Sequence, residues 1–263
     1  MTDAVERENI PIVVTAFGTT EKAFATYGKM DEIFRTRFPD NPIVWAYSSR
    51  MVKHAMKKKK ALDLKDPLEV MAELGAAGHT WAVLQSLHLI CGHEFDRLVA
   101  ERDHAGLRTA VGLPLLTSRE DYEDAAKALA GCMPAADSGT AAVLVGHGTD
   151  HPSWSAYPAF EDVLRRTWGN HCFAGVVEGY PEAEDILRRV MAAGFTKIRL
   201  IPFMLVAGVH FKEDLTCEED SWQKTFERAG IRVEVVDEGI GALAGISEIY
   251  CRHMGEALDI IPV

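Results

Sequence analysis

The sequence lacks the features that mark secreted, disulfide-bonded and membrane-spanning proteins. Its 263 residues hold five cysteines, an odd number with no CxxC spacing, which fits reduced thiols better than a disulfide framework. The longest apolar run, residues 198–211, is too short for a membrane span and is interrupted by Arg199 and Pro202. The first residues are polar and acidic, without the basic start and apolar centre of a secretory signal. We therefore expect a cytoplasmic protein with no membrane partner.

Positive charge is also scarce. The 28 lysine and arginine residues are outnumbered by 39 acidic residues, and the formal net charge is −11. A chain of this charge repels phosphate backbones, so nucleic acid is not an expected partner. The exception is a run of four lysines at 57–60, preceded by Arg50 and Lys53. Such a run is usually a solvated helix face, and the alternative is that it attracts a polycarboxylated substrate.

Sequence templates for several common chemistries are missing as well. The chain has no GxxxxGK[ST] motif, no full GxGxxG motif after a strand, no GxSxG motif and no HExxH motif. Its cysteines and histidines do not form a cluster in the sequence. The chemistry therefore has to come from side chains that the fold brings together.

What the chain does contain is a regular alternation of short apolar runs with helical patterns. This alternation predicts βαβ units and parallel sheets covered on both faces. The expected strands cover residues 12–17, 43–49, 81–87, 109–112, 141–146, 172–178, 198–206 and 231–236. The expected helices include 22–38, one that begins at Asp66-Pro67, 120–130, 157–168, 181–193, 212–229 and 244–257. The small, polar segment 133–140 is typical of a linker, which predicts an N-terminal domain 1–134 and a C-terminal domain 135–263.

The two halves also match each other in sequence. Gly78 and Gly194 occupy equivalent places at an offset of 194 − 78 = 116 residues. The same offset pairs Gly92 with Gly208, Phe95 with Phe211 and Glu94 with His210. In addition, AFGTT at 16–20 matches GHGTD at 146–150, so that Phe17 stands where His147 does. We therefore predict an α/β fold of two similar, doubly wound parallel-sheet domains that arose by internal duplication.

Three side chains that can bind metals stand at the ends of three successive apolar runs in the second half. They are His147, Glu178 and His210. Ligands of parallel sheets bind outside the carboxyl ends of the strands, and neighbouring strands lie roughly 4.8 Å apart. Imidazole and carboxylate are ordinary ligands of divalent first-row metals, so the trio predicts a metal site. Each residue also has an alternative role without a metal. His147 could be a histidine in a glycine turn, Glu178 a carboxylate at a helix start, and His210 a buried core histidine.

The first half lacks this set but supplies other polar and aromatic groups. The duplication matches Glu94 to His210, so Glu94 is predicted to face the metal site across a cleft between the two halves. There it would accept a proton or contact one of the metal ligands. Its alternative role is that of an exposed carboxylate at a helix start. Phe17 and His88 are predicted to join Glu94 in binding the substrate, although His88 also suits a packed strand residue. His93 is expected to be solvated.

Four motifs carry a resemblance to a known family. They are AFGTT at the start, VGHGT around His147, VEGYP around Glu178 and LVAGVHFKEDL around His210. Together they resemble the anaerobic-pathway sirohydrochlorin cobaltochelatases, which are class II chelatases, and the resemblance spans essentially the whole chain. It implies two similar α/β domains with a tetrapyrrole cleft between them, and it implies that His147, Glu178 and His210 form the metal site. Glu94 matches an acidic cleft position of the family more loosely, because the residues around it differ.

The chemistry of the candidate ligands agrees with this resemblance. Insertion of a divalent ion into a tetrapyrrole requires a partly desolvated metal and the removal of two pyrrole N–H protons. Two imidazoles and one carboxylate can hold Co²⁺ while leaving positions open for the ring nitrogens. We expect His147 or His210 to accept a proton, with Glu178 or Glu94 as a relay.

Other functions stay open at this point. The same ligands accept Fe²⁺ or Ni²⁺, so iron insertion into sirohydrochlorin or insertion into a porphyrin is an alternative. A non-catalytic carrier of a tetrapyrrole or a metal is another. A homo-oligomer is compatible with the sequence, as is an additional tetrapyrrole held by a surface histidine such as His93 or His104.

Overall fold

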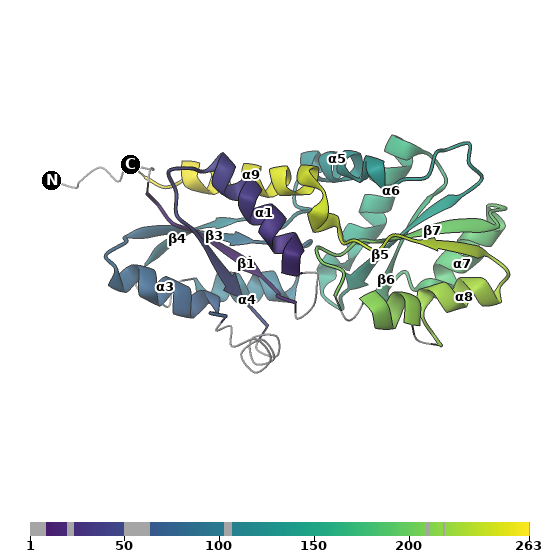
Figure 1. The fold of residues 1–263 in the computed structure, drawn as a ribbon, viewed down its shortest axis with the longest axis horizontal. Coiled ribbons are helices and arrows are strands. Elements are labelled where there is room, and N and C mark those ends of the chain that lie inside the picture. Colours follow the sequence, from purple (N-terminus) through teal and green to yellow (C-terminus); the bar gives the residue numbers. More distant parts are fainter. Residues whose placement is uncertain are drawn as a thin grey trace.

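The computed structural model describes residues 9–19, 24–49, 64–102, 107–208, 211–217 and 219–262. Strands and helices alternate along both halves, as the sequence predicts (Figure 1). The first half contains β1 (Ile12–Ala16), α1 (Phe24–Arg37), β2 (Ile43–Tyr47), α3 (Pro67–Ala76), β3 (Trp81–Ser86), α4 (His93–Glu101), β4 (Arg108–Gly112), α5 (Arg119–Ala128) and η1 (Leu129–Gly131). The second half contains β5 (Ala141–Gly148), η2 (Pro152–Ser155), α6 (Ala156–Trp168), β6 (Cys172–Glu178), α7 (Ala183–Ala192), β7 (Lys197–Pro202), η3 (Phe211–Cys217), α8 (Trp222–Arg228), β8 (Arg232–Val235), η4 (Ile240–Ala242) and α9 (Ala244–Asp259).

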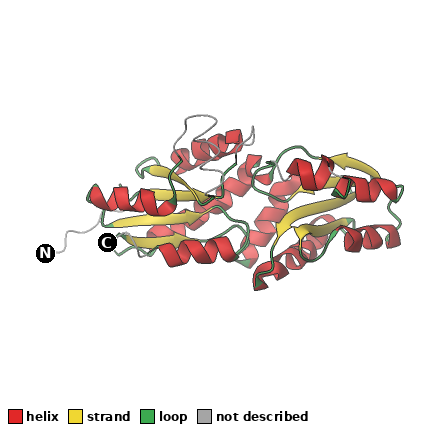
Figure 2. Ribbon diagram, turned by 90° about the horizontal axis from the view of Figure 1, so that it is seen from below, coloured by secondary structure: helices red, strands yellow, loops and turns green. Residues whose placement is uncertain are grey.

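Within the described residues, eight strands form two four-stranded sheets with the same internal order. The order is β2-β1-β3-β4 in the first sheet and β6-β5-β7-β8 in the second, and every pair is parallel. Helices cover both faces of each sheet (Figure 2). Glycines that the duplication matches share a left-handed backbone, with φ of 94° at Gly78 and 82° at Gly194. The predicted fold class, with two doubly wound α/β units related by duplication, is confirmed.

The sequence explains why these segments form buried strands. Strands of a parallel sheet covered on both faces have no solvent side, so their residues are apolar without alternation. All five residues of β1 and the first six of β5 are buried. The helix starts follow capping chemistry. Asp66 caps α3 and Ser118 caps α5, each in a reciprocal capping box with the residue three positions on.

Two predicted elements are wrong in their extent. The helix predicted at 212–229 is divided into the π-helical turn η3 and the short helix α8, because Ser221 caps α8 by accepting a hydrogen bond from the Lys224 N–H. The strand predicted at 198–206 ends at Pro202. The chain leaves the sheet there, and the carbonyl groups of Met204 and Leu205 accept hydrogen bonds from η4 instead.

The last helix, α9, returns to the first half of the molecule. Figure 1 shows α9 (yellow) beside α1 and the first sheet, and its Tyr250 is fully buried there. The Tyr250 hydroxyl lies 3.2 Å from the carbonyl oxygen of Leu87 and 3.1 Å from that of His88, in the loop after β3. The predicted division at residues 134 and 135 thus separates the two sheets, whereas the helices cross it. The division into two domains stays a prediction.

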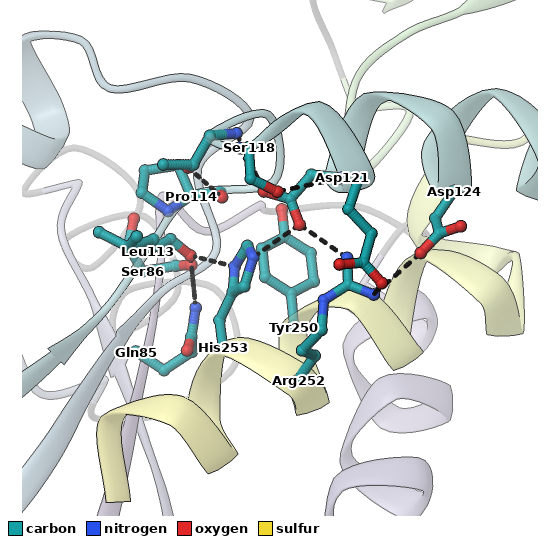
Figure 3. Close-up of polar contacts among 12 residues, drawn as sticks. Gln85, Ser86, Leu113, Pro114, Ser118, Asp121, Asp124, Tyr250, Arg252 and His253 are labelled. Atoms are coloured by element: carbon teal, nitrogen blue, oxygen red, sulfur yellow. Dashed lines mark hydrogen bonds and ion pairs between the residues drawn. The ribbon is translucent and has the colours of Figure 1, made fainter. Parts of the chain in front are cut away.

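A buried polar cluster fastens α9 to α5 (Figure 3). The Asp121 carboxylate accepts hydrogen bonds from His253 at 2.9 Å, Arg252 at 2.7 Å and the Ser118 backbone N–H at 2.6 Å. Burial alone would raise the pKa of Asp121, but these hydrogen bonds outweigh it and hold the pKa well below its usual range. The other ring nitrogen of His253 lies 2.9 Å from the Leu113 carbonyl oxygen. Both ring nitrogens of His253 are therefore engaged, one with the loop after β4 and one with α5.

The two halves also share apolar packing. One core cluster contains Val14 of the first sheet, Phe160 of α6 and Ile201 of the second sheet. In the part of the chain that the structure describes, no helix is long and apolar enough to cross a membrane.

Candidate active site at the carboxyl ends of the strands

His147 and Glu178 lie at the carboxyl ends of the neighbouring strands β5 and β6. The ladder between these strands pairs Gly148 with Glu178. Both strands are buried until their last residues, and both His147 and Glu178 are exposed. The helix-start alternative for Glu178 is not realised, because α7 begins only at Ala183 with Glu182 as its N-cap. The two candidate ligands therefore lie at the carboxyl ends of adjacent strands, where the strand-end argument expects them.

The glycines around His147 make this close approach possible. A Cβ atom at Gly148 would lie 1.8 Å from the Glu178 carbonyl oxygen, and Gly148 has a φ of 93° that other residues rarely adopt. At Gly146 a Cβ atom would lie 2.3 Å from the ring of Tyr157. The Tyr157 hydroxyl in turn accepts a hydrogen bond from the Gly148 N–H at 3.2 Å. The GHG sequence is thus required by packing on both sides of the histidine.

The third predicted ligand, His210, lies outside the described residues. Within the described ranges, no three His, Cys, Asp or Glu side chains form a group that could hold a metal ion. The chain just before His210 is placed, however, because a Cβ atom at Gly208 would lie 3.3 Å from the Thr19 hydroxyl oxygen. Thr19 follows the carboxyl end of β1. The segment that leads to His210 therefore reaches the strand ends of the first sheet, and the three-ligand set stays a prediction.

Glu94 lies in the first turn of α4 and is partly exposed. Its carboxylate accepts a hydrogen bond from the Ser48 hydroxyl at 3.1 Å and another from Arg97 at 2.6 Å. Ser48 follows β2, so these contacts tie the start of α4 to the carboxyl ends of the first sheet. The helix-start position is confirmed, and a role in proton transfer stays a prediction.

His88 follows β3 and is held as a neutral imidazole. Burial lowers its pKa to about 4, an effect that the charge of Glu94 partly opposes and that of Arg97 reinforces. Its Nδ1 lies 2.8 Å from the Ser86 hydroxyl, and its Nε2 is buried without a hydrogen-bond partner. His88 therefore cannot contribute a positive charge near neutral pH, and its predicted contact with substrate is untested.

Phe17 lies directly after β1, at the position that duplication matches to His147, and its side chain is half exposed. It stands at the carboxyl edge of the first sheet, where a substrate contact was predicted. The lysine run at 57–60 and His104 lie outside the described residues.

Two histidine–aspartate pairs join the halves beside these residues, which the sequence did not reveal. His93 Nε2 on α4 lies 2.9 Å from Asp150, and His151 Nε2 lies 3.2 Å from Asp96 on α4. The two imidazole rings meet edge to face at 4.9 Å. His93 is exposed, as expected, but the Asp150 carboxylate accepts its hydrogen bond, and this contact lowers the pKa of Asp150. This His–Asp clasp (His93, Asp96, Asp150 and His151) links the helix that carries Glu94 to the loop after His147.

A cavity of about 460 Å³ lies elsewhere, at the amino ends of β3 and β4. It is lined by Trp81, Arg102, Arg108 and Ile260, among others. Because ligands of parallel sheets bind at the opposite strand ends, this cavity does not belong to the candidate site.

Comparison with known proteins identifies relatives along the whole chain. The model of the cobalt chelatase (CbiK) family matches residues 11–259. The sirohydrochlorin cobaltochelatase of Salmonella typhimurium strain LT2 is 30% identical over 226 residues, which cover 84% of this chain and 85% of the relative. The sirohydrochlorin cobaltochelatase CbiKC of Nitratidesulfovibrio vulgaris strain Hildenborough is 31% identical over 260 residues, with 95% and 91% covered.

Solved structures show the same fold at lower identity. The sirohydrochlorin chelatase SirB of Bacillus subtilis subspecies spizizenii, in complex with cobalt, aligns with a TM-score of 0.66 and 15% identity over 95% of this chain and 96% of that one. SirB from Bacillus subtilis with Fe³⁺ aligns with a TM-score of 0.67 and 13% identity, covering 95% of each chain. At these identities the likeness concerns the fold alone.

Proposed function

The chain belongs to the cobalt chelatase (CbiK) family. We propose that it inserts Co²⁺ into sirohydrochlorin, the tetrapyrrole that appears in the names of its relatives. Such an insertion is the cobalt-requiring step of a cobalamin-type biosynthesis. The observation that supports this function most directly is the placement of His147 and Glu178 at adjacent strand ends. Metal chelation needs ligands that converge on one ion, and the ends of adjacent strands can bring together side chains that are far apart in the sequence.

His147, Glu178 and His210 hold the substrate metal in this proposal. Two neutral imidazoles and one carboxylate bind a divalent first-row ion firmly enough to strip part of its water shell. They also leave coordination positions open, which is the property of a site that passes its metal on. The strand order supports the set, because β5 lies between β6, which ends at Glu178, and β7, the strand that precedes His210 in the sequence.

Proton removal completes the reaction. The ring loses two N–H protons as its nitrogens bind the metal, so one divalent cation replaces two protons and the charge is balanced. His147 and His210 are suited to accept protons once the metal moves to the ring, since the imidazole nitrogen that releases the metal has a lone pair that can bind a proton. Glu94 is proposed as a further acceptor on the opposite wall. Its carboxylate would exchange part of its contact with Arg97 for a ring proton.

A metal-insertion assay tests this function. Purified protein is mixed with sirohydrochlorin and Co²⁺, and the absorbance change of the ring is followed for wild type, His147→Ala, Glu178→Ala and His210→Ala. We expect each ligand variant to lose at least about a hundredfold in rate. The reason is that the metal is no longer held in place for the ring, and a misplacement of about 1 Å can already cost that factor. The matched control is His79→Ala, at the amino end of β3 and away from the strand ends that carry the ligands. Near-normal rates in all three ligand variants would contradict the proposed roles.

Iron insertion is the second candidate, because the Bacillus subtilis neighbour SirB is described with Fe³⁺ and the same ligand types accept several ions. Parallel assays with Co²⁺, Fe²⁺ and Ni²⁺ separate the metals. Stoichiometric binding of sirohydrochlorin without turnover would instead indicate a carrier. A cytoplasmic location and a homo-oligomeric state are retained as proposals from the sequence.

A further inference from the structure

Large apolar side chains that remain in water gather at the carboxyl ends of the strands. Within the described residues, six such side chains are exposed: Phe17, Leu113, Trp154, Tyr180, Met191 and Ile260. Four of them follow strands on that side. Phe17 follows β1, Leu113 follows β4, and Trp154 and Tyr180 lie in the connections after β5 and β6. Exposed apolar surface that concentrates beside polar, ligand-capable groups is typical of a binding site for a partly apolar molecule.

Trp154 and Tyr180 form a preassembled pair within this group. Their ring centroids are 5.9 Å apart and their planes meet at 80°, which is the favourable edge-to-face arrangement. Even in contact, Trp154 keeps 41% of its surface exposed and Tyr180 keeps 56%. The pair thus has an ordered geometry but leaves much of its aromatic area uncovered.

The pair is tied to the two candidate ligands through their loops. Tyr180 comes two residues after Glu178, and Trp154 lies in η2, on the loop that follows β5 and its His147. The loops pack against each other, because a Cβ atom at Gly179 would lie 3.3 Å from the Thr149 carbonyl oxygen. The aromatic pair is therefore held at a fixed place relative to His147 and Glu178.

The η2 turn also lies against the first half of the molecule. A Cβ atom at Gly92, the N-cap of α4, would lie 3.5 Å from the hydroxyl oxygen of Ser153, the neighbour of Trp154. The contact between His151 and Asp96 joins the same two segments. Trp154 consequently stands where the loop after β5 approaches α4, the helix that carries Glu94 in its first turn.

We propose that Trp154 and Tyr180 are substrate-positioning residues, an aromatic rim that packs against the tetrapyrrole ring and fixes it beside His147 and Glu178. This inference rests on the proposed function, since the tetrapyrrole is its occupant. A tetrapyrrole offers a broad apolar ring system with carboxylates only at its periphery. Aromatic side chains can pack against the apolar ring system, whereas the metal ligands face the nitrogens at its centre. The rim acts on binding of the ring and takes no part in proton transfer.

The test is a titration of sirohydrochlorin into the metal-free protein, followed by quenching of tryptophan fluorescence and by ring absorbance. Trp154→Leu and Tyr180→Leu remove the aromatic faces but keep an apolar side chain. Each is expected to raise the Kd roughly tenfold, the loss typical of an aromatic stacking contact. Trp154→Phe and Tyr180→Phe keep a ring and are expected to bind within about twofold of wild type. Met191→Ala is the matched control, because Met191 is equally exposed, at 52%, on α7 and outside the strand-end group.

Insertion kinetics provide the second readout. The leucine variants are expected to raise KM for sirohydrochlorin while kcat stays near that of wild type, which a general loss of folding would not produce. The rim is refuted if the leucine variants bind the ring as tightly as wild type, or if the phenylalanine variants lose as much affinity as the leucine variants. Wild-type protein that binds no sirohydrochlorin overturns the proposed function together with the rim. Wild-type protein that binds and inserts cobalt, with leucine variants that bind equally well, overturns the rim alone.

Discussion

Replacement of Gly148 by alanine tests whether the packing around His147 places the two ligands. The added Cβ atom would lie 1.8 Å from the Glu178 carbonyl oxygen, whereas ordinary contact begins at 3.4 Å. The backbone of β5 or β6 must therefore move by about 3.4 − 1.8 = 1.6 Å at the point where both ligands emerge. A misplacement of roughly 1 Å in a catalytic constellation can cost about a hundredfold in rate. We expect Gly148→Ala to lose cobalt insertion by at least that factor.

Gly78→Ala is the matched control for backbone strain. Gly78 has a φ of 94°, against 93° at Gly148, but a Cβ atom there would meet no atom within 4 Å. It should cost only the strain of a left-handed residue, about 1–2 kcal/mol. Gly148→Ala should cost that amount and a further 1–3 kcal/mol or so for the steric overlap. Urea unfolding measures both variants and an insertion assay measures their rates. If Gly148→Ala matches Gly78→Ala in stability and inserts cobalt normally, the packing argument is wrong.

Substitutions at three further sites, Asp121, Tyr250 and His93, probe the contacts between the halves. Asp121→Ala should destabilise the protein by about 3–5 kcal/mol in urea unfolding, because it leaves the Arg252 guanidinium and the buried His253 ring without the carboxylate that both contact. The pKa of Asp121 is lower in the folded protein than in the unfolded chain, so its carboxylate stabilises the fold above a pH of about 4, and this stabilisation is lost as the pH falls below that value. The unfolding free energy of Asp121→Asn should lack this dependence on pH in an acid titration. Tyr250→Phe should cost about 1–2 kcal/mol by thermal unfolding, because the buried carbonyl of Leu87 loses its donor, and an unchanged melting temperature would contradict this. His93→Ala should slow insertion roughly threefold through the clasp, as expected for an exposed pair. The exchange of His93 and Asp150 should restore the rate, and a failure of this rescue would argue against the clasp.

The strands and the duplication were predictable because burial on both faces leaves a continuous apolar run in the sequence. Identical strand orders and matched left-handed glycines at Gly78 and Gly194 follow from the same repeat. The break between η3 and α8 was missed, although Ser221 is a recognisable N-cap residue. Its signal lay within a long helical pattern and was outweighed by periodicity.

The contacts across the two halves could not be derived from the sequence. The apolar periodicity of α9 shows that one face of the helix is buried but does not say which sheet covers it, so neither Tyr250 nor Asp121 could be assigned a partner. The clasp depends in the same way on how α4 meets the loop after β5. The adjacency of His147 and Glu178 was predictable, because strand order and strand ends determine it. Contacts that depend on how one half of the molecule packs on the other were not predictable from the sequence.

The most direct measurement is the anomalous scattering of cobalt from crystals of the protein soaked with Co²⁺. The proposed function predicts one strong peak bonded to His147, Glu178 and His210, at metal–ligand distances of about 2.0–2.2 Å. A cobalt peak bonded to neither His147 nor Glu178, in crystals of protein that inserts cobalt, would contradict the central claim that the strand ends of the second sheet hold the metal.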